Sequence, residues 1–212
     1  MIRGYALALS LGVIAAAIFA GWYSTTRVVY FAPALFEQSV DCGPGGGGRW
    51  PVIDTFEADW YGGALRAFGE PSLYSASLNP EASAGSLRFT WLRSFRDPIF
   101  VRIDRAADGG VQLSAGQRAK GGRPGSQTRR VSRRLTPAEV RELDAVLIQT
   151  ALSEQPPKSC DGGTDGARWI IEAVEPSTGY VYVNRWTPRE GPVRELGLHM
   201  LELTGWEIAD VY

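Results

Sequence analysis

Histidine and cysteine are scarce in this chain of 212 residues, which has one histidine and two cysteines. A structural zinc site takes four ligands that are mostly His and Cys, and three such residues in total do not supply one. The sequence also lacks a nucleophile elbow and the glycine fingerprints of nucleotide-binding loops. We therefore expect no metal and no cofactor, and the sequence identifies no catalytic residue.

An excess of charge of either sign is also missing, because 22 Lys and Arg face 23 Asp and Glu, giving a net charge of -1. This balance excludes a wholesale basic nucleic-acid binder, and the 44% of hydrophobic residues excludes a disordered tail. The charges are unevenly placed, however. Residues 109–138 carry seven basic and no acidic residues, whereas residues 139–212 carry six basic and 13 acidic ones.

The chain has a single long apolar run, Tyr5–Tyr23, which lies between Arg3 and Arg27. As a helix this run is roughly 28 Å long, close to the ~30 Å hydrocarbon core of a bilayer. A retained membrane anchor is favoured over a cleaved signal peptide, because Ile18 occupies the place where a cut before Gly21 needs a small residue.

The positive charge of Arg3 favours a cytoplasmic N-terminus and an exported body. We expect a single-pass membrane protein whose C-terminal domain is exported to an oxidising compartment outside the cytoplasm; secretion after signal cleavage is the alternative. In that oxidising compartment Cys42 and Cys160 can form one disulfide, and two unpaired thiols are the alternative.

The sequence divides into three segments. Residues 1–26 are the anchor or signal segment, residues 27–51 a stalk and Gly-rich linker, and residues 52–212 an exported domain. The linker ends in the four consecutive glycines Gly45–Gly48, a run typical of flexible reach.

The exported domain alternates helical and strand-like patterns. Asp54 and Glu57 have the form of a capping box, and Thr136-Pro137 with Glu139 is a strong helix start. The patterns predict helices over 55–68, 136–152 and 192–204, and strands over 86–94, 98–105, 111–118, 127–134, 167–175 and 179–187. We expect an α+β fold: an N-terminal transmembrane helix, then one domain with an antiparallel sheet of about six strands and about three helices packed on one face.

Two of the predicted hairpins carry tryptophan and tyrosine. Turns at Arg96-Asp97 and Ser177-Thr178 place Trp91 opposite Arg102 and Trp169 opposite Trp186, so that each hairpin presents an aromatic face. Such a face is typical of a platform where Trp and Tyr stack on a ligand and Arg holds anionic groups. The candidate binding residues are Trp91, Arg93, Arg102, Trp169, Tyr182 and Trp186. Alternatively, one of these faces is the core beneath the helices.

The basic segment is a candidate surface for anionic lipid head groups or cell-wall polymers. Nucleic acid is not expected, because export removes the usual partner and no aromatic residue is interleaved in this segment. The alternative is a solvated loop and edge strand whose charges deter pairing between sheets. The residues concerned are Arg118, Lys120, Arg123, Arg129, Arg130, Arg133 and Arg134.

Carboxylates offer little catalytic signal. Asp161 and Asp165 lie in a Gly-rich turn but lack the third acidic position and the bidentate Glu of a calcium loop. His199 is expected at the border of the core. An envelope hydrolase directed at carbohydrate is the alternative function, and it requires Asp or Glu side chains that converge beside one of the candidate tryptophans.

An ordered set of motifs spans residues 55–212 and resembles a family of exported or membrane-anchored bacterial proteins, best known from alphaproteobacteria and without an assigned activity. The motifs include Glu70-Pro71-Ser72-Leu73, Leu87-Arg88-Phe89-Thr90-Trp91-Leu92-Arg93-Ser94-Phe95, Asp165-Gly166-Ala167-Arg168-Trp169-Ile170-Ile171-Glu172 and Asn184-Arg185-Trp186-Thr187-Pro188. The resemblance implies a shared fold and supplies no catalytic residue. With this resemblance, we expect a non-catalytic binding or scaffolding domain that is anchored in the bacterial inner membrane by a single span and faces the periplasm.

Overall fold

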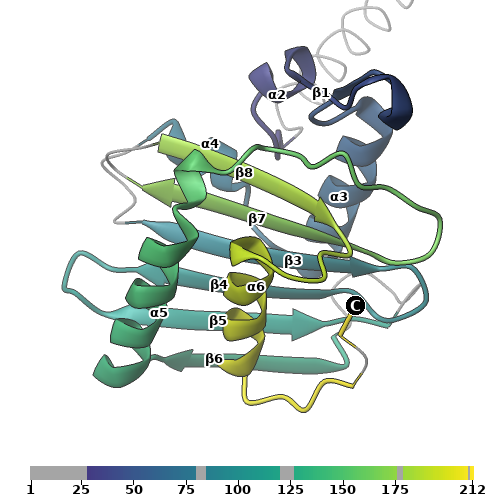
Figure 1. Cartoon of the computed structure of the whole chain (residues 1–212). Helices are drawn as coiled ribbons and strands as arrows, with labels where there is room; N and C mark the ends of the chain where they lie inside the picture. Colours follow the sequence, from purple (N-terminus) through teal and green to yellow (C-terminus); the bar gives the residue numbers. More distant parts are fainter. Residues whose placement is uncertain (1–27, 80–84, 120–126, 176–178, 210) are drawn as a thin grey trace, which may run out of the picture.

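The computed structural model of the chain describes residues 28–79, 85–119, 127–175, 179–209 and 211–212 (Figure 1). The membrane anchor predicted over 1–26 lies outside these residues. Within the described ranges, none of the helices has the length and apolar character needed to cross a bilayer.

Six antiparallel strands form the main sheet, in the order β6-β5-β4-β3-β7-β8. Their bounds are β3 (Ser86–Arg93), β4 (Ile99–Arg105), β5 (Val111–Gln117), β6 (Arg129–Arg134), β7 (Ala167–Glu175) and β8 (Gly179–Trp186). The predicted α+β class and the predicted antiparallel sheet are confirmed.

The three predicted helices are present as α3 (Thr55–Phe68), α5 (Pro137–Thr150) and α6 (Pro192–Glu202). Asp54 with Glu57, and Thr136 with Glu139, form capping boxes at the starts of α3 and α5, and each box satisfies backbone N–H groups that have no partner inside the helix. The sequence did not predict two short helices, α2 (Ala34–Glu37) and α4 (Leu73–Ser77), or the 3-10 turns η1 (Pro44–Gly46) and η3 (Leu152–Glu154).

Helices cover both faces of the sheet, so the expectation that they pack on one face is wrong. In Figure 1, α5 and α6 lie in front of the sheet, and α3 and α4 lie behind it. Leu143 of α5 and Met200 of α6 belong to the same core cluster as Phe89 in front, while Tyr61 of α3 belongs to a second cluster with Ile170 behind. Nearly every residue of β3 and β7 is buried, and both faces of these strands therefore need a covering layer.

The described residues before α3 belong to the domain, so the predicted stalk is wrong for residues 28–51. β1 (Ser39–Asp41) pairs with β2 (Arg49–Pro51), and the glycine run forms the turn between them. Tyr30 and Phe31 are buried in the core behind the sheet. Their apolar burial, together with the disulfide between Cys42 and Cys160, fixes a segment that its glycines alone would leave flexible.

The predicted register of the first hairpin is also wrong. Residues 94–98 separate β3 from β4, so the turn is longer than the two-residue turn expected at Arg96-Asp97. Trp91 pairs with Ile99 instead of Arg102. The observed partner is three residues before the predicted one. A shift in register by an odd number of residues moves the side chains expected on one face of the sheet to the other face.

The second hairpin differs by one residue. Trp169 pairs with Arg185, and Arg168 pairs with Trp186. Trp169 therefore faces the front core with Trp91, whereas Trp186 faces the back of the sheet. The two hairpins therefore do not present the aromatic faces that were predicted from their turns.

Candidate functional site

Trp91 and Trp169 lie side by side in the front core, and both are 0% exposed. Their ring centroids are 5.4 Å apart. Helix α6 closes over them at Gly197, where an added Cβ would lie 2.7 Å from the Trp169 ring. These two candidate residues are core and do not form an open platform for a ligand.

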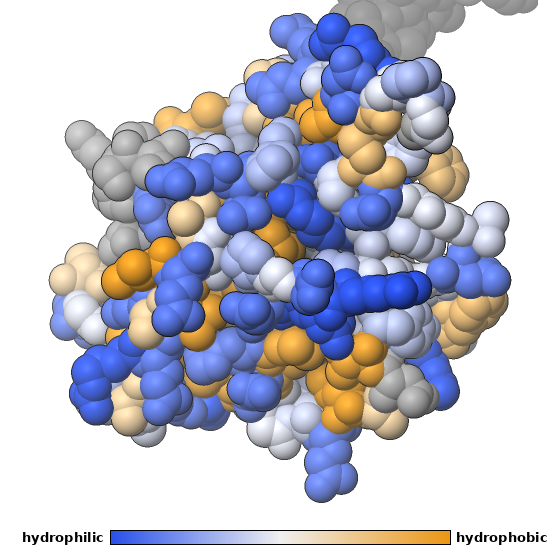
Figure 2. Space-filling model, in the orientation of Figure 1, coloured by the Kyte–Doolittle hydropathy of each residue, from blue (hydrophilic) through white to orange (hydrophobic). Residues whose placement is uncertain are grey.

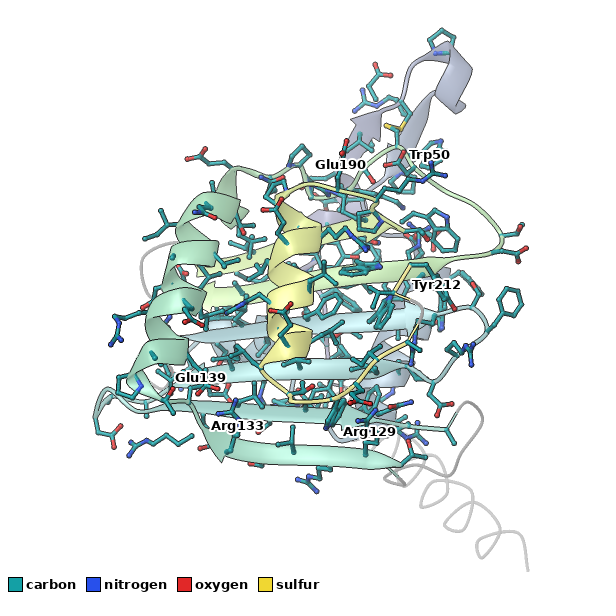
Figure 3. The ribbon with its side chains drawn as sticks, turned by 60° about the horizontal axis from the view of Figure 1, so that its bottom comes forward. Trp50, Arg129, Arg133, Glu139, Glu190 and Tyr212 are labelled. Carbon is teal, nitrogen blue, oxygen red and sulfur yellow. A yellow bond between two sulfur atoms is a disulfide. The ribbon has the colours of Figure 1, made fainter. Side chains whose placement is uncertain are left out.

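The indole N–H groups of both tryptophans form hydrogen bonds with Tyr212. The Nε1 groups of Trp91 and Trp169 donate hydrogen bonds to one main-chain oxygen of Tyr212, at 3.2 and 3.0 Å. The guanidinium of Arg93 lies 4.4 Å from the centre of the Trp91 ring. Figure 3 labels Tyr212 at this end of the strands. Three of the six candidate binding residues thus lie together, and what they bind is a segment of this chain.

The other three candidates lie on the back of the sheet in separate surroundings. Tyr182 is buried, and its hydroxyl accepts a hydrogen bond from Asn184 Nδ2 at 3.2 Å. Burial raises the pKa of Tyr182 well above 10. Trp186 is stacked by Arg168, whose guanidinium lies 4.9 Å from the ring centre. Arg102 belongs to the ion-pair network described next.

A buried charge network connects β3, β4 and β7 with the loop before α4. Arg88 is 0% exposed and donates to Glu172 Oε2 from Nε at 3.0 Å and from Nη2 at 2.6 Å. Arg102 Nη1 pairs with Glu70 Oε2 at 2.9 Å, and Arg102 Nε pairs with Asp104 at 2.9 Å. Burial raises the pKa of Glu70, and the neighbouring arginines oppose that shift. These charges are used in holding the fold.

A second buried cluster surrounds Glu57. Its carboxylate accepts hydrogen bonds from Lys158 Nζ at 2.9 and 3.1 Å and from the Tyr61 hydroxyl at 3.1 Å, and Arg168 Nη2 lies 3.1 Å away. Burial raises the pKa of Tyr61. Sequence reasoning missed this cluster, because 101 residues separate Glu57 from Lys158 and no local pattern joins them. For Arg88 and Glu172 a signal existed, since each lies between two hydrophobic neighbours on its strand.

Among the described residues, Trp186 is the candidate tryptophan that shares a groove with several carboxylates. It lines a groove of about 800 Å³ together with Asp161, Asp165 and Glu190. Within the described part of the chain, no three His, Cys, Asp or Glu side chains lie close enough together to hold a metal ion. The Asp161–Gly166 turn passes over Trp186, and an added Cβ at Gly163 would lie 2.8 Å from its Nε1.

Part of the basic segment is engaged by other residues of the chain. Arg133 Nη1 donates to Glu139 Oε2 at 3.0 Å, and this hydrogen bond is the main reason that the pKa of Glu139 falls to about 2. Arg129 Nη1 donates to the main-chain oxygen of Glu207 at 3.2 Å. Figure 3 shows Arg133 next to Glu139. Arg118 is buried against Phe68. Lys120 and Arg123 lie outside the described residues.

The remaining positive charge lies on the edge strand β6. Arg130, Ser132 and Arg134 are exposed and share one face of this strand. In the described ranges no ion pair joins Arg130 to another residue, and Arg134 pairs with Asp108 at 3.3 Å with both side chains more than 60% exposed. An ion pair this exposed contributes little, so both guanidinium groups remain accessible.

An apolar cleft lies between α5 and the adjacent ends of strands β3, β4 and β7. Its volume is about 490 Å³, and it is lined by Leu87, Ile103, Leu147 and Ala173, with the ion pair of Arg105 and Asp144 beside it. Figure 2 shows apolar surface on the left of this face of the molecule, next to α5. Its volume suits a small ligand.

Comparison with known proteins adds no functional assignment. No protein-family model matches the chain, and no curated protein matches it.

Proposed function

We propose that the chain is a membrane-tethered, non-catalytic binding domain on the periplasmic side of a bacterial inner membrane, and that the exposed arginines of β6 hold an anionic partner. We also propose that the chain belongs to the family of exported bacterial proteins that its motifs resemble.

The disulfide supports the compartment. Cys42 and Cys160 are joined, and the described residues include no free cysteine. Disulfides persist in oxidising compartments and are rare in the cytosol. The apolar run Tyr5–Tyr23 beside Arg3 supports export and a single span.

The observation that carries the binding role is the accessible positive charge of β6. The buried acids Glu57, Glu70 and Glu172 are engaged by Arg and Lys, whereas Arg130 and Arg134 project into solvent. A surface of this kind attracts anionic partners at a salt-dependent rate and affinity. Lipid head groups, cell-wall polymers and acidic polypeptides all have the required charge.

The test uses the full chain in nanodiscs of neutral lipid. Binding of anionic vesicles, a wall polymer and polyglutamate is measured at low and at physiological salt for the natural chain and for Arg130→Ala/Arg134→Ala. The matched control, Arg49→Ala/Arg189→Ala, removes two exposed arginines that lie outside the six-stranded sheet. We expect binding of at least one anionic probe that weakens with salt and with the β6 variant only. Equal loss in both variants, or no binding of any probe, contradicts the proposal.

The second candidate is the carbohydrate-directed hydrolase, and the observation that favours it is the groove with Asp161, Asp165 and Glu190 beside Trp186. Hydrolysis of purified wall glycan by the natural chain, abolished in Asp161→Asn or Glu190→Gln, is the expected result for this function. A natural chain that releases no product excludes it for that substrate.

A further inference from the structure

The two edge strands of the sheet, β8 and β6, differ in whether another segment of the chain pairs with them. At β8, the N–H of Asn184 donates to the Pro157 oxygen at 2.8 Å, and Lys158 makes a parallel bridge to the same residue. This covering segment is fastened by the disulfide at Cys160. At the opposite edge, β6 has β5 as its one neighbour in the described sheet (Figure 1).

The register shows which backbone groups of β6 are available. The N–H of Leu135 donates to the Val111 oxygen at 2.9 Å, so odd-numbered positions of β6 face β5. The backbone N–H and C=O groups of Arg130, Ser132 and Arg134 therefore point away from β5, and of these the Arg134 oxygen already accepts a hydrogen bond from Arg133 Nη1 at 3.4 Å. An open edge of this kind is a template for another extended segment.

The charges of the strand select what can pair there. The sequence of β6 is Arg129-Arg130-Val131-Ser132-Arg133-Arg134. A second copy of β6 in antiparallel pairing would place arginines opposite arginines, and like charges directly opposite are destabilising. A strand with acidic residues at alternate positions would instead place carboxylates beside Arg130 and Arg134.

We propose that an extended acidic polypeptide segment adds to β6 as a seventh strand of the sheet, bonded through the backbone of residues 130–134 and selected by Arg130 and Arg134. This inference rests on the proposed function, because it names the chemical class of the anionic partner.

The test measures the affinity of the full chain, in neutral nanodiscs, for a fluorescent peptide of alternating glutamate and valine. Three further peptides separate the sources of affinity: one with lysine in place of glutamate, one with the valines replaced by proline, and one with the same side chains but N-methylated amides along one edge. On the protein side, Ser132→Pro removes an outward N–H, which an edge strand tolerates, and Ser132→Ala is its matched control.

We expect the acidic peptide to bind, and both the N-methylated and the proline peptide to lose at least about tenfold in affinity, because each lost hydrogen bond is worth roughly two- to tenfold. Ser132→Pro weakens binding while Ser132→Ala does not, and the lysine peptide does not bind. If the N-methylated peptide binds as tightly as the parent, the site recognises charge alone, as a lipid or polymer would supply, and the strand-addition proposal is overturned while the proposed function stands. If none of the anionic probes binds, both are overturned. The comparison of peptides uses the unaltered protein and does not depend on whether Ser132→Pro folds.

Discussion

Removal of the disulfide is expected to cost a large part of the stability of the domain. Cys42 and Cys160 are 118 residues apart in the sequence. In the chain-entropy model a cross-link over this separation disfavours the unfolded state by roughly 4.9 kcal/mol at 25 °C. In the folded state the burial of Tyr30, Phe31 and Ile53 also holds this part of the chain in place. We therefore expect Cys42→Ser/Cys160→Ser to keep the native fold and to lose about 3–5 kcal/mol in the free energy of unfolding.

The assay is denaturant unfolding of the full chain in a mild detergent, followed by tryptophan fluorescence, which reports on Trp91 and Trp169 in the core. Without the cross-link the unfolded chain exposes more surface, so the dependence of free energy on denaturant should steepen as the midpoint falls. A reducing agent should shift the natural chain and leave the double Ser variant unchanged. A loss below about 1 kcal/mol would refute the reasoning that the bond acts on the unfolded chain.

Three further predictions concern the core and its charges. Gly197→Ala should destabilise by about 1–3 kcal/mol in denaturant unfolding, because the new Cβ overlaps the Trp169 ring; an unchanged midpoint would show that α6 shifts freely. Arg88→Met should cost about 3–5 kcal/mol by leaving Glu172 buried without its cation, whereas Arg88→Met/Glu172→Leu should recover most of that loss; equal loss in both variants would contradict the account. The pKa of Glu139 is lowered to about 2, so its stabilisation is fully present above about pH 4.5 and is lost as the pH falls through 2. The stability difference between the natural chain and Glu139→Gln should therefore shrink between pH 5 and pH 2 in thermal unfolding, and a difference that stays constant would refute this origin.

The positions of most helices and strands could be predicted because their signals are local. The capping box at Asp54, the Thr136-Pro137 start of α5 and the turn glycines act within a few residues of the chain. Short elements such as α2 and α4 were missed, since they are held by contacts with distant parts of the domain. The hydroxyl of Ser72 at the start of α4, for example, donates to the Val29 oxygen at 2.5 Å.

The candidate site could be predicted only in part. Trp91, Arg93 and Trp169 do lie together, but their face was assigned from a register that depends on loop length, and residues 94–98 make that loop longer than a tight turn. The partners of the basic segment were equally hidden. Arg129 contacts Glu207, a residue 78 positions further along the chain, and no local pattern indicates that contact.

The sequence by itself determined the class of the fold, the order of the three long helices and the six strands of the main sheet, and the uneven distribution of charge, because these depend on composition and on neighbours along the chain. The tertiary structure decided which tryptophans are buried, which acids and bases pair, and which arginines stay in solvent. Side chains on a strand alternate between its faces, so a shift of one or three residues in pairing exchanges core and surface. For that reason Trp91 and Trp169 lie in the core and not on an open face. The accessible candidate residues are instead Arg130 and Arg134 at the open edge of the sheet.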